Sequence, residues 1–247
     1  MSVLLNTTEN ATCTLQLNRP DKLNALNREI YALLTDGINE ASNNTDVRSI
    51  IIKGTADIFT AGNDLGDFAA AVREGGTFDA PFSLMSAMLN CEKPVIASVD
   101  GPAIGIGTTM LFHCDLVYAS HSARFQTPFT DLGVCPEFAS SETMPAVLGS
   151  HKAAQMLLLG DPMSAEEAVH HGLINQLVDS ETLDETVNKV AARFAAKSAD
   201  SLSTSRALLK VRNAEYQQII DREAEQFGRL MNTDEFRQKL DNFLNKK

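Results

Sequence analysis

The first half of the chain carries short apolar runs that predict strands separated by helices. Apolar and polar residues alternate over 12–17, as they do in a half-buried strand. Apolar residues then recur at helical spacing over 26–41, and residues 49–53 resume the character of a strand. Further buried strands are predicted over 94–99 and 115–119. Strands that alternate with helices in this order are typical of an α/β fold.

The segments between these strands predict shorter helices and one irregular region. Residues 66–81 carry glycine, charge and proline, and we expect them to form a mobile loop or a frayed helix. Short helices are predicted over 82–89 and 106–113. Ser164 and Glu167 have the spacing of a capping box, which starts a helix that we expect to end near Gly172.

Nearly every segment beyond residue 181 has helical spacing. The predicted helices are 182–197, 201–212, 214–231 and 233–244. The chain contains no low-complexity linker. We therefore expect an α/β core over residues 1–195 and a helical C-terminal region over 196–247, which packs on the core or on a neighbouring subunit.

Charge and composition argue against several classes of function. The 247 residues include 21 basic and 32 acidic side chains, a formal charge of −11 that argues against nucleic-acid binding. No apolar run is long enough to span a membrane, because Asp100 interrupts the longest one. The five histidines form no metal-ligand pattern, so we expect no metal site. Four cysteines without C-x-x-C spacing, and no secretory signal, predict reduced thiols in the cytoplasm.

Two glycine-bearing turns are the strongest candidates for chemistry. Residues 59–65 and 100–107 each follow a predicted buried strand, and the second turn leads directly into a helix. Glycine permits a close approach of the backbone to a ligand, and the free amides at the start of a helix attract negative charge. Ordinary turn geometry explains either segment alone, but the pair favours a ligand site. Together they could direct two backbone N–H groups at one oxygen, which is an oxyanion hole.

Several motifs resemble those of the enoyl-CoA hydratase/isomerase (crotonase) superfamily. In chain order they are residues 17–20, 24–26, 59–65, 99–107, 114–115, 125–136 and 159–178. Residues 17–20 and 24–26 are similar to the N-terminal signature of the family. Residues 59–65 are similar to its first oxyanion segment, and residues 99–107 and 114–115 to its second. Because the order and the spacing agree, the resemblance covers most of the chain.

This resemblance implies a fold, a substrate and an assembly. The implied fold is a superhelix of repeated ββα units, with C-terminal helices that mediate homotrimers or dimers of trimers. The implied substrate is an acyl-CoA thioester, in which coenzyme A is part of the substrate and no separate cofactor is needed. By position, the backbone N–H groups of Asn63 and Ile106 would form the oxyanion hole.

The same correspondence assigns substrate contacts. The residues expected to contact the substrate or its coenzyme A part are Lys22, Ala25, Ala61, Gly62, Asp64, Leu65, Gly105 and Phe129. Lys22, with Arg19 nearby, would offset the phosphate charge of coenzyme A. From the residues alone, a solvated loop pair explains Lys22 and Arg19 equally well.

The chain departs from the hydratases of this family where they carry two catalytic glutamates. Those positions hold Thr109 and Phe129, and neither side chain exchanges a proton at neutral pH. Glu137 stands where hydratases commonly have glycine, which resembles the Δ3,Δ2-enoyl-CoA isomerase branch, especially its peroxisomal-type members. The resemblance therefore implies a single-glutamate isomerase. Phe129 would be an apolar wall that excludes water, although a simple packing role fits it equally well.

Without the resemblance, a surface role is the ordinary expectation for Glu137, which is one of 32 acidic residues. Its apolar neighbours Cys135 and Phe138 favour a low-dielectric pocket that raises the pKa of the carboxyl. A raised pKa suits a general base that must return its proton. Asp131 and Glu142 are nearby alternatives, for which we expect a solvated loop and a helix start, respectively.

The hypothesis is an isomerase of fatty-acid oxidation that converts a 3-enoyl-CoA into a 2-trans-enoyl-CoA. Glu137 would take a proton from C2 and return it to C4. The alternatives are hydration with Glu137 as the lone base, another crotonase-type reaction such as thioester hydrolysis, and an acyl-CoA-binding protein without turnover. Residues 243–247 lack the Ser-Lys-Leu peroxisomal address, so the cytoplasm is the expected compartment.

Overall fold

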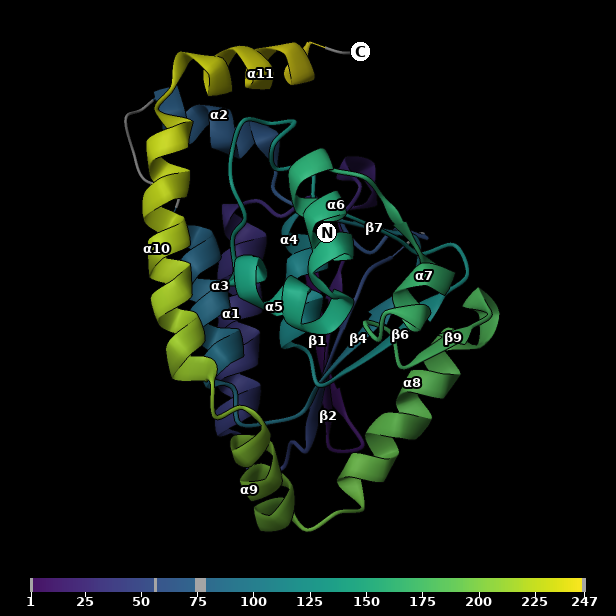
Figure 1. The fold of residues 1–247 in the computed structure, drawn as a ribbon. Helices are drawn as coiled ribbons and strands as arrows, with labels where there is room; N and C mark the ends of the chain where they lie inside the picture. Colours follow the sequence, from purple (N-terminus) through teal and green to yellow (C-terminus); the bar gives the residue numbers. More distant parts are fainter. Residues whose placement is uncertain (1, 56, 74–78, 246–247) are drawn as a thin grey trace.

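The computed structural model describes residues 2–55, 57–73 and 79–245, which form a mixed α/β core flanked by long helices (Figure 1). The strands are β1 (Leu4–Glu9), β2 (Thr12–Leu17), β3 (Ser49–Lys53), β4 (Val95–Val99), β5 (Pro102–Ile104), β6 (Leu116–Ser120), β7 (Arg124–Gln126), β8 (Met163–Ser164) and β9 (Gln176–Val178). The α-helices are α1 (Arg28–Asn43), α2 (Leu65–Arg73), α3 (Ala80–Asn90), α4 (Ile106–Thr109), α5 (Ser140–Leu148), α6 (Ser150–Leu159), α7 (Ala165–His170), α8 (Ser180–Ala195), α9 (Ala199–Leu209), α10 (Asn213–Met231) and α11 (Asp234–Leu244). Two short 3₁₀ helices, η1 (Pro20–Lys22) and η2 (Met110–His113), complete the described elements.

Six strands form the main sheet in the order β1-β2-β3-β4-β6-β9. β1 pairs antiparallel with β2, and the other neighbouring strands are parallel. Parallel strands are normally covered on both faces, and β4 is accordingly buried along its whole length. A second, smaller sheet has the order β5-β7-β8.

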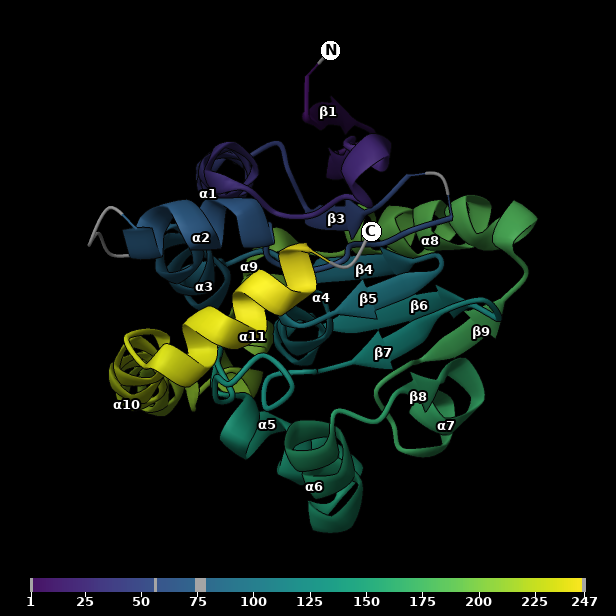
Figure 2. The same ribbon diagram turned by 90° about the horizontal axis from the view of Figure 1, so that it is seen from above.

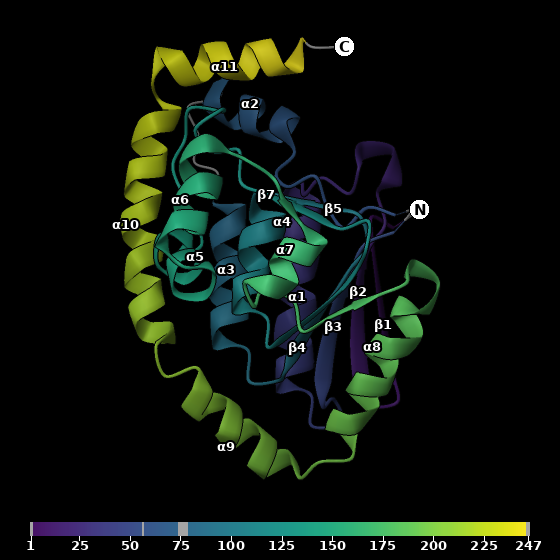
Figure 3. The same cartoon turned by 45° about the vertical axis from the view of Figure 1, so that its right-hand side comes forward.

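The side chains of β3 alternate between the two faces of the main sheet. Ile50 and Ile52 belong to the large hydrophobic core that α1 and α3 help to form. Ile51 instead lies in a second apolar cluster with Ile96, on the face that α8 covers. Figure 3 shows α8 and α3 on opposite sides of the main sheet.

Local signals explain why α1 forms where it does. The side chain of Asn27 accepts a hydrogen bond from the amide of Ile30 and so caps the first turn. The buried residues Ile30, Leu34 and Ile38 then recur every four positions, which turns one face of the helix toward the core. The helix lies beside α3 on that face of the sheet.

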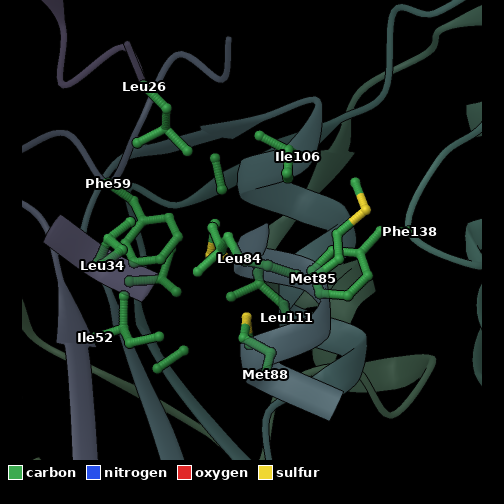
Figure 4. Close-up of a cluster of buried hydrophobic side chains, with 14 of the residues drawn as sticks. Leu26, Leu34, Ile52, Phe59, Leu84, Met85, Met88, Ile106, Leu111 and Phe138 are labelled. Atoms are coloured by element: carbon green, nitrogen blue, oxygen red, sulfur yellow. The ribbon is translucent and has the colours of Figure 1, made fainter. Parts of the chain in front are cut away.

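Side chains from both glycine turns belong to the hydrophobic core, part of which Figure 4 shows in close-up. Phe59 from the first turn and Ile106 from the start of α4 are both fully buried there, together with Phe138. Burying each of these side chains contributes about 1.5–3 kcal/mol. The three segments that carry the candidate site are therefore anchored in one apolar cluster.

The C-terminal helices pack on the core of their own chain. Arg206 of α9 forms an ion pair at 2.8 Å with Asp115, which directly precedes β6. α11 runs from the end of α10 across the top of the molecule (Figure 2) and packs against α2. There the ring of Phe68 contacts those of Phe227 and Phe236. Packing on the core, one of the two arrangements expected for this region, is therefore present.

The structure confirms most predicted elements and corrects others. The strands predicted over 12–17 and 49–53 have the observed bounds, and the capping box of Ser164 starts α7. Within the range 66–81, residues up to 73 are helical as part of α2, and residues 74–78 lie outside the described residues. β1 was not predicted, because five of its six residues are exposed and no apolar alternation marks it.

Candidate active site

The two glycine turns lie side by side, beyond the C-terminal ends of β3 and β4. Thr60 forms an isolated parallel bridge with Ala103 of β5. The Thr60 amide donates to the Pro102 carbonyl at 3.0 Å, and the Thr60 carbonyl accepts from the Ile104 amide at 3.0 Å. Backbone hydrogen bonds therefore hold the first turn against the second.

Two glycines allow this close approach. Gly62 has a φ of +83°, and a Cβ at this position would lie 2.6 Å from the carbonyl oxygen of Ile104. A Cβ on Gly107 would lie 2.4 Å from Cγ2 of Thr60. Position 62 therefore requires glycine for its backbone conformation as well as for space.

The amide of Asn63 lies between two amides that have partners. The Gly62 amide donates to Oγ1 of Thr60 at 3.1 Å, and the Asp64 amide donates to the Leu26 carbonyl at 2.9 Å. For the N–H of Asn63 itself, the described part of the chain offers no acceptor. An amide without a protein partner is a donor that a ligand can use.

The amide of Ile106 is the corresponding group of the second turn. Gly105 adopts a φ of +57°, and its own amide donates to the Gln126 carbonyl at 2.8 Å. Ile106 then begins α4, so its N–H is among those that a helix leaves without an internal acceptor. Among residues 2–55, 57–73 and 79–245, none accepts a hydrogen bond from this amide. Among the described residues, each turn thus presents a free backbone donor at the expected position, Asn63 in the first turn and Ile106 in the second.

Tyr31 of α1 holds the side chain of Asn63. The phenol of Tyr31 donates a hydrogen bond to Oδ1 of Asn63, and Tyr31 is fully buried. Burial, with a further contribution from the Glu137 carboxyl, raises the pKa of Tyr31 well above its usual value, so the phenol remains a donor. This role of Tyr31 was not predicted from the sequence, although the hydroxyl of a tyrosine on the buried face of a helix usually needs a partner.

Glu137 is buried, with only 7% of its surface exposed. Its Oε1 accepts a hydrogen bond of 2.5 Å from Oγ1 of Thr109, the last residue of α4. Burial raises the pKa of Glu137 to about 8; the Thr109 bond opposes this shift, and the Glu223 carboxylate adds to it. One short helix therefore carries a free amide at its start, on Ile106, and a donor to Glu137 at its end.

The two alternative carboxylates have a different environment. Asp131 and Glu142 are both exposed, and Glu142 lies in the first turn of α5. The surface role that is the ordinary expectation for Glu137 is wrong. Of the three candidate carboxylates, Glu137 alone is shielded from solvent, although the exposed Asp131 lines the cavity described below.

A cavity of about 640 Å³ opens beside the two turns. The predicted residues that line it are Ala61, Gly62, Asn63, Leu65, Gly105 and Phe129. The predicted residues that do not line it are Lys22, Ala25, Asp64, Ile106 and Glu137. The C-terminal helices contribute Phe227, Phe236 and Lys239, which were not predicted from the sequence. Their only sequence signal was the amphipathic spacing of α10 and α11, which does not show what the apolar face covers.

Arg19 and Lys22 have separate roles in the structure. The guanidinium of Arg19 contacts Asp64 at 2.6 Å and also donates to the Ala25 carbonyl at 3.1 Å. Burial alone would raise the pKa of Asp64, but the hydrogen bond from Arg19, with two backbone amides, holds it below the usual value. Arg19 thus stabilises the first turn rather than belonging to a solvated pair. Lys22 is exposed at the end of η1.

Neither a metal site nor a membrane-spanning helix is found among the described residues. In the part of the chain that the structure describes, no group of three histidine, cysteine or acidic side chains could hold a metal ion. Within the same ranges, none of the helices has both the length and the apolar character needed to cross a membrane.

Comparison with known proteins identifies the family. The chain belongs to the enoyl-CoA hydratase/isomerase family, whose model matches residues 7–247. It is 33% identical to Enoyl-CoA delta isomerase 2 of Rattus norvegicus over 227 residues, which are 89% of this chain and 57% of that protein. It is also 33% identical to Crotonyl-CoA hydratase of Syntrophomonas wolfei, over 97% of this chain and 94% of that protein. The chain thus spans little more than half the length of the rat relative and nearly all of the bacterial one.

A solved structure confirms the fold that the resemblance implies. The enoyl-CoA hydratase/isomerase from Pseudoalteromonas atlantica T6c superposes with a TM-score of 0.93 at 37% identity, over 100% of this chain and 98% of that one. The chain therefore has the crotonase-like fold with a helical C-terminal region. Because the relatives include an isomerase and a hydratase, membership in the family leaves the reaction open.

Proposed function

We propose that the protein is a crotonase-type acyl-CoA enzyme, a Δ3,Δ2-enoyl-CoA isomerase that converts a 3-enoyl-CoA into a 2-trans-enoyl-CoA. The observation that carries this proposal is the burial of Glu137 next to the helix that presents the free Ile106 amide. The similarity to Enoyl-CoA delta isomerase 2 supports it. Coenzyme A enters as part of the substrate, and no other cofactor is needed.

The proposed reaction uses the two free amides as an oxyanion hole. The thioester carbonyl accepts hydrogen bonds from the N–H groups of Asn63 and Ile106. The Glu137 carboxylate removes a proton from C2, and the electrons of that C–H bond move into the conjugated system to give a dienolate. The negative charge gathers on the thioester oxygen, where losing one donor would cost about 3–4 kcal/mol. The Glu137 carboxyl then returns its proton to C4, which leaves the double bond between C2 and C3.

The environment of Glu137 suits both halves of this proton transfer. With a pKa near 8, the conjugate acid forms readily and remains able to give its proton back. At neutral pH roughly one tenth of the groups would be ionised and ready to act as base. The Thr109 hydroxyl donates to one carboxyl oxygen and leaves the other for the substrate.

Two features favour isomerisation over addition of water. At the positions where the resemblance places the glutamates of hydratases, this chain has Thr109 and Phe129, neither of which transfers protons. Phe129 is buried at the wall of the cavity, where an apolar ring excludes water from the dienolate. The intermediate then reacts only with the proton that Glu137 holds.

Hydration with Glu137 as the lone base is the second candidate, because the chain is similar to Crotonyl-CoA hydratase over nearly its whole length. A hydratase would consume a 2-enoyl-CoA and lower the absorbance of its conjugated thioester. An isomerase would raise that absorbance when it is given a 3-enoyl-CoA. One spectroscopic assay with both esters separates the two activities.

The Glu137→Gln variant tests the role of the carboxyl. We expect isomerisation of 3-hexenoyl-CoA to fall about 10²–10⁴-fold, because the amide cannot carry the proton. Binding of the coenzyme A ester, measured by calorimetry, should remain, since the backbone donors are untouched. The matched control is Glu142→Gln, which makes the same change at an exposed carboxylate further along the chain and should leave turnover unchanged.

Other outcomes of this test contradict the proposal in different ways. Retained turnover in Glu137→Gln would move the role of base to another group, with Asp131 the first to examine. Tight acyl-CoA binding without any turnover by the unmodified protein would indicate a non-catalytic acyl-CoA-binding protein. Consumption of 2-enoyl-CoA alone would indicate a hydratase.

Assembly and compartment remain predictions within this proposal. A homotrimer, or a dimer of such trimers, is expected from the resemblance, and light scattering of the purified protein measures it. A cytoplasmic location is expected from the cysteine usage, and cell fractionation tests it.

A further inference from the structure

The backbone directly after Glu137 is held in an unusual conformation. Phe138 and Ala139 have φ values of 59° and 56°, so two consecutive residues with side chains lie in the left-handed region. Such residues cost on the order of 1 kcal/mol or more each and persist only where the surroundings fix them. The direction of the Glu137 side chain therefore depends on whatever holds this turn.

The carboxylate of Glu223, on α10, closes one side of the turn. Its Oε2 accepts from the Ala139 amide at 2.7 Å, and its Oε1 accepts from the Ser141 amide at 3.0 Å and from the Ser141 hydroxyl at 2.5 Å. Only 9% of the Glu223 surface is exposed. The backbone amides can only donate, so this arrangement fits an ionised carboxylate that accepts at both oxygens.

His113 closes the other side. Its Nε2 donates to the Phe138 carbonyl at 2.7 Å, and its ring stacks on the Phe138 ring with centroids 4.1 Å apart. Burial lowers the pKa of His113 to about 4, so the imidazole is neutral at physiological pH. His113 thus fixes the turn without adding charge, and Glu223 is the charged group of the pair.

We propose that Glu223 is a positioning residue for Glu137. When α10 docks, the Glu223 carboxylate holds the turn that follows Glu137 and places a second negative charge near the Glu137 carboxyl. The proposal rests on the proposed function only where it calls Glu137 the base. Both carboxylate oxygens of Glu223 are occupied by Ala139 and Ser141, so Glu223 acts through the turn that carries Glu137 and not on the substrate.

The charge of Glu223 has a direct electrostatic consequence. A second carboxylate nearby opposes ionisation of Glu137 and so raises its pKa, in addition to the larger effect of burial. Burial also raises the pKa of Glu223 itself, but its hydrogen bonds from Ser141 and Ala139 oppose that shift and favour the ionised form.

Other titratable groups also face this pair of carboxyls. They are Tyr31 from α1, His113 from η2, Cys135 on the same segment and Arg222 on α10, while Arg229 of α10 acts on Cys135. Tyr31 and His113 are neutral at physiological pH, and burial raises the pKa of Cys135 to about 11. Arg222 lowers the pKa of Glu223 and so supports its ionised form.

The Glu223→Gln variant tests both parts of the proposal. In the unmodified protein, the amides of Ala139 and Ser141 donate to different oxygens of the Glu223 carboxylate. A glutamine has only one oxygen, so one of these two N–H groups would face its NH₂ group. We expect kcat for the 3-enoyl-CoA to fall about tenfold as the base is misplaced, with KM unchanged. Loss of the charge should move the midpoint of the rise in kcat/KM to lower pH. The matched control is Glu225→Gln, an exposed residue on the same helix, which should change neither quantity.

A direct titration keeps this test independent of the reaction. Isotope-edited NMR of the glutamate side-chain carboxyls follows Glu137, assigned by its absence in Glu137→Gln. We expect its midpoint to be lower in Glu223→Gln than in the unmodified protein. If the unmodified protein shows no isomerisation, the proposed function fails, while this titration still decides the role of Glu223.

Two results would overturn the inference. One is a Glu223→Gln protein that melts at a lower temperature but keeps the kcat and the pH midpoint of the unmodified protein, since Glu223 would then serve the fold alone. If Glu223→Gln does not fold, Ser141→Ala replaces it, because it removes one hydroxyl donor and leaves both amide bonds in place. We expect Ser141→Ala to lower kcat about threefold without changing KM, and an unchanged kcat would also overturn the inference.

Discussion

The two halves of the candidate site are built in different ways. The Asn63 and Ile106 donors are main-chain groups, and backbone hydrogen bonds such as those between Thr60 and Pro102 hold them in place. The Glu137 carboxyl depends instead on side chains from other elements, beginning with the hydroxyl of Thr109. Backbone pairing tolerates changes of side chain but not a Cβ added to a closely packed glycine. A side-chain network, in contrast, is lost when one of its hydrogen-bonding side chains is replaced. Each half should therefore fail under a different kind of substitution.

Gly62→Ala should have the largest effect on the half made of backbone. The new Cβ would meet the Ile104 carbonyl oxygen at 2.6 Å, so the two turns must separate. We expect turnover to fall about 10²–10³-fold, the usual cost of one lost oxyanion donor. Gly149→Ala is the matched control, because Gly149 has a similar φ of +80° but nothing within 4 Å of its added Cβ. Equal loss of activity in both variants would show that backbone strain alone, and not the spacing of the turns, is responsible.

Thr109→Val probes the half made of side chains and should have an intermediate effect. The Thr109 hydroxyl stabilises the ionised form of Glu137, so its loss should raise the pKa of that carboxyl above about 8. The ionised fraction at neutral pH then falls, and we expect kcat/KM there to drop about tenfold and to recover at higher pH. Thr143→Val is the control, since the hydroxyl of Thr143 is buried and has no partner among the described residues. A profile shifted to lower pH would contradict the assignment.

Lys22→Ala should have the smallest effect, because Lys22 lies at the exposed end of η1. We expect KM for the coenzyme A ester to rise about threefold without a change in kcat, and the difference to vanish at high salt. A pantetheine thioester, which lacks the nucleotide phosphates, should bind both proteins equally. Lys189→Ala on the exposed face of α8 provides the comparison. An equal rise in KM with both esters would remove Lys22 from phosphate binding.

The same contrast explains what the sequence could predict. The strands predicted over 12–17 and 49–53, the Ser164 capping box of α7 and the glycine turns carry local signals, because apolar period, capping chemistry and positive φ each depend on neighbouring residues. The free amides of Asn63 and Ile106 follow from such signals once the turns are aligned with those of the family. The candidate donors could therefore be located from the glycine turns together with the family resemblance.

The support of Glu137 could not be located in this way. Glu223 is one of several acidic residues in an amphipathic helix, and its partners Ala139 and Ser141 are 84 and 82 residues away. His113 has the pattern of an ordinary core residue. Such contacts arise only when the helices dock, so no local period reveals them. The apolar neighbours of Glu137 favoured its burial over the ordinary surface role, but no local pattern pointed to the groups that hold it.

The late position of α10 in the chain also matters for biosynthesis. Ribosomes deliver both glycine turns and Glu137 long before Glu223 emerges. A nascent polypeptide at that stage already contains the candidate donor amides of Asn63 and Ile106, but the turn that follows Glu137 still lacks its hydrogen bonds to Glu223. Catalytic activity should therefore appear abruptly, when α10 and α11 pack against the core. A polypeptide whose synthesis stops shortly before these helices should be inactive, even though it contains every group of the proposed mechanism.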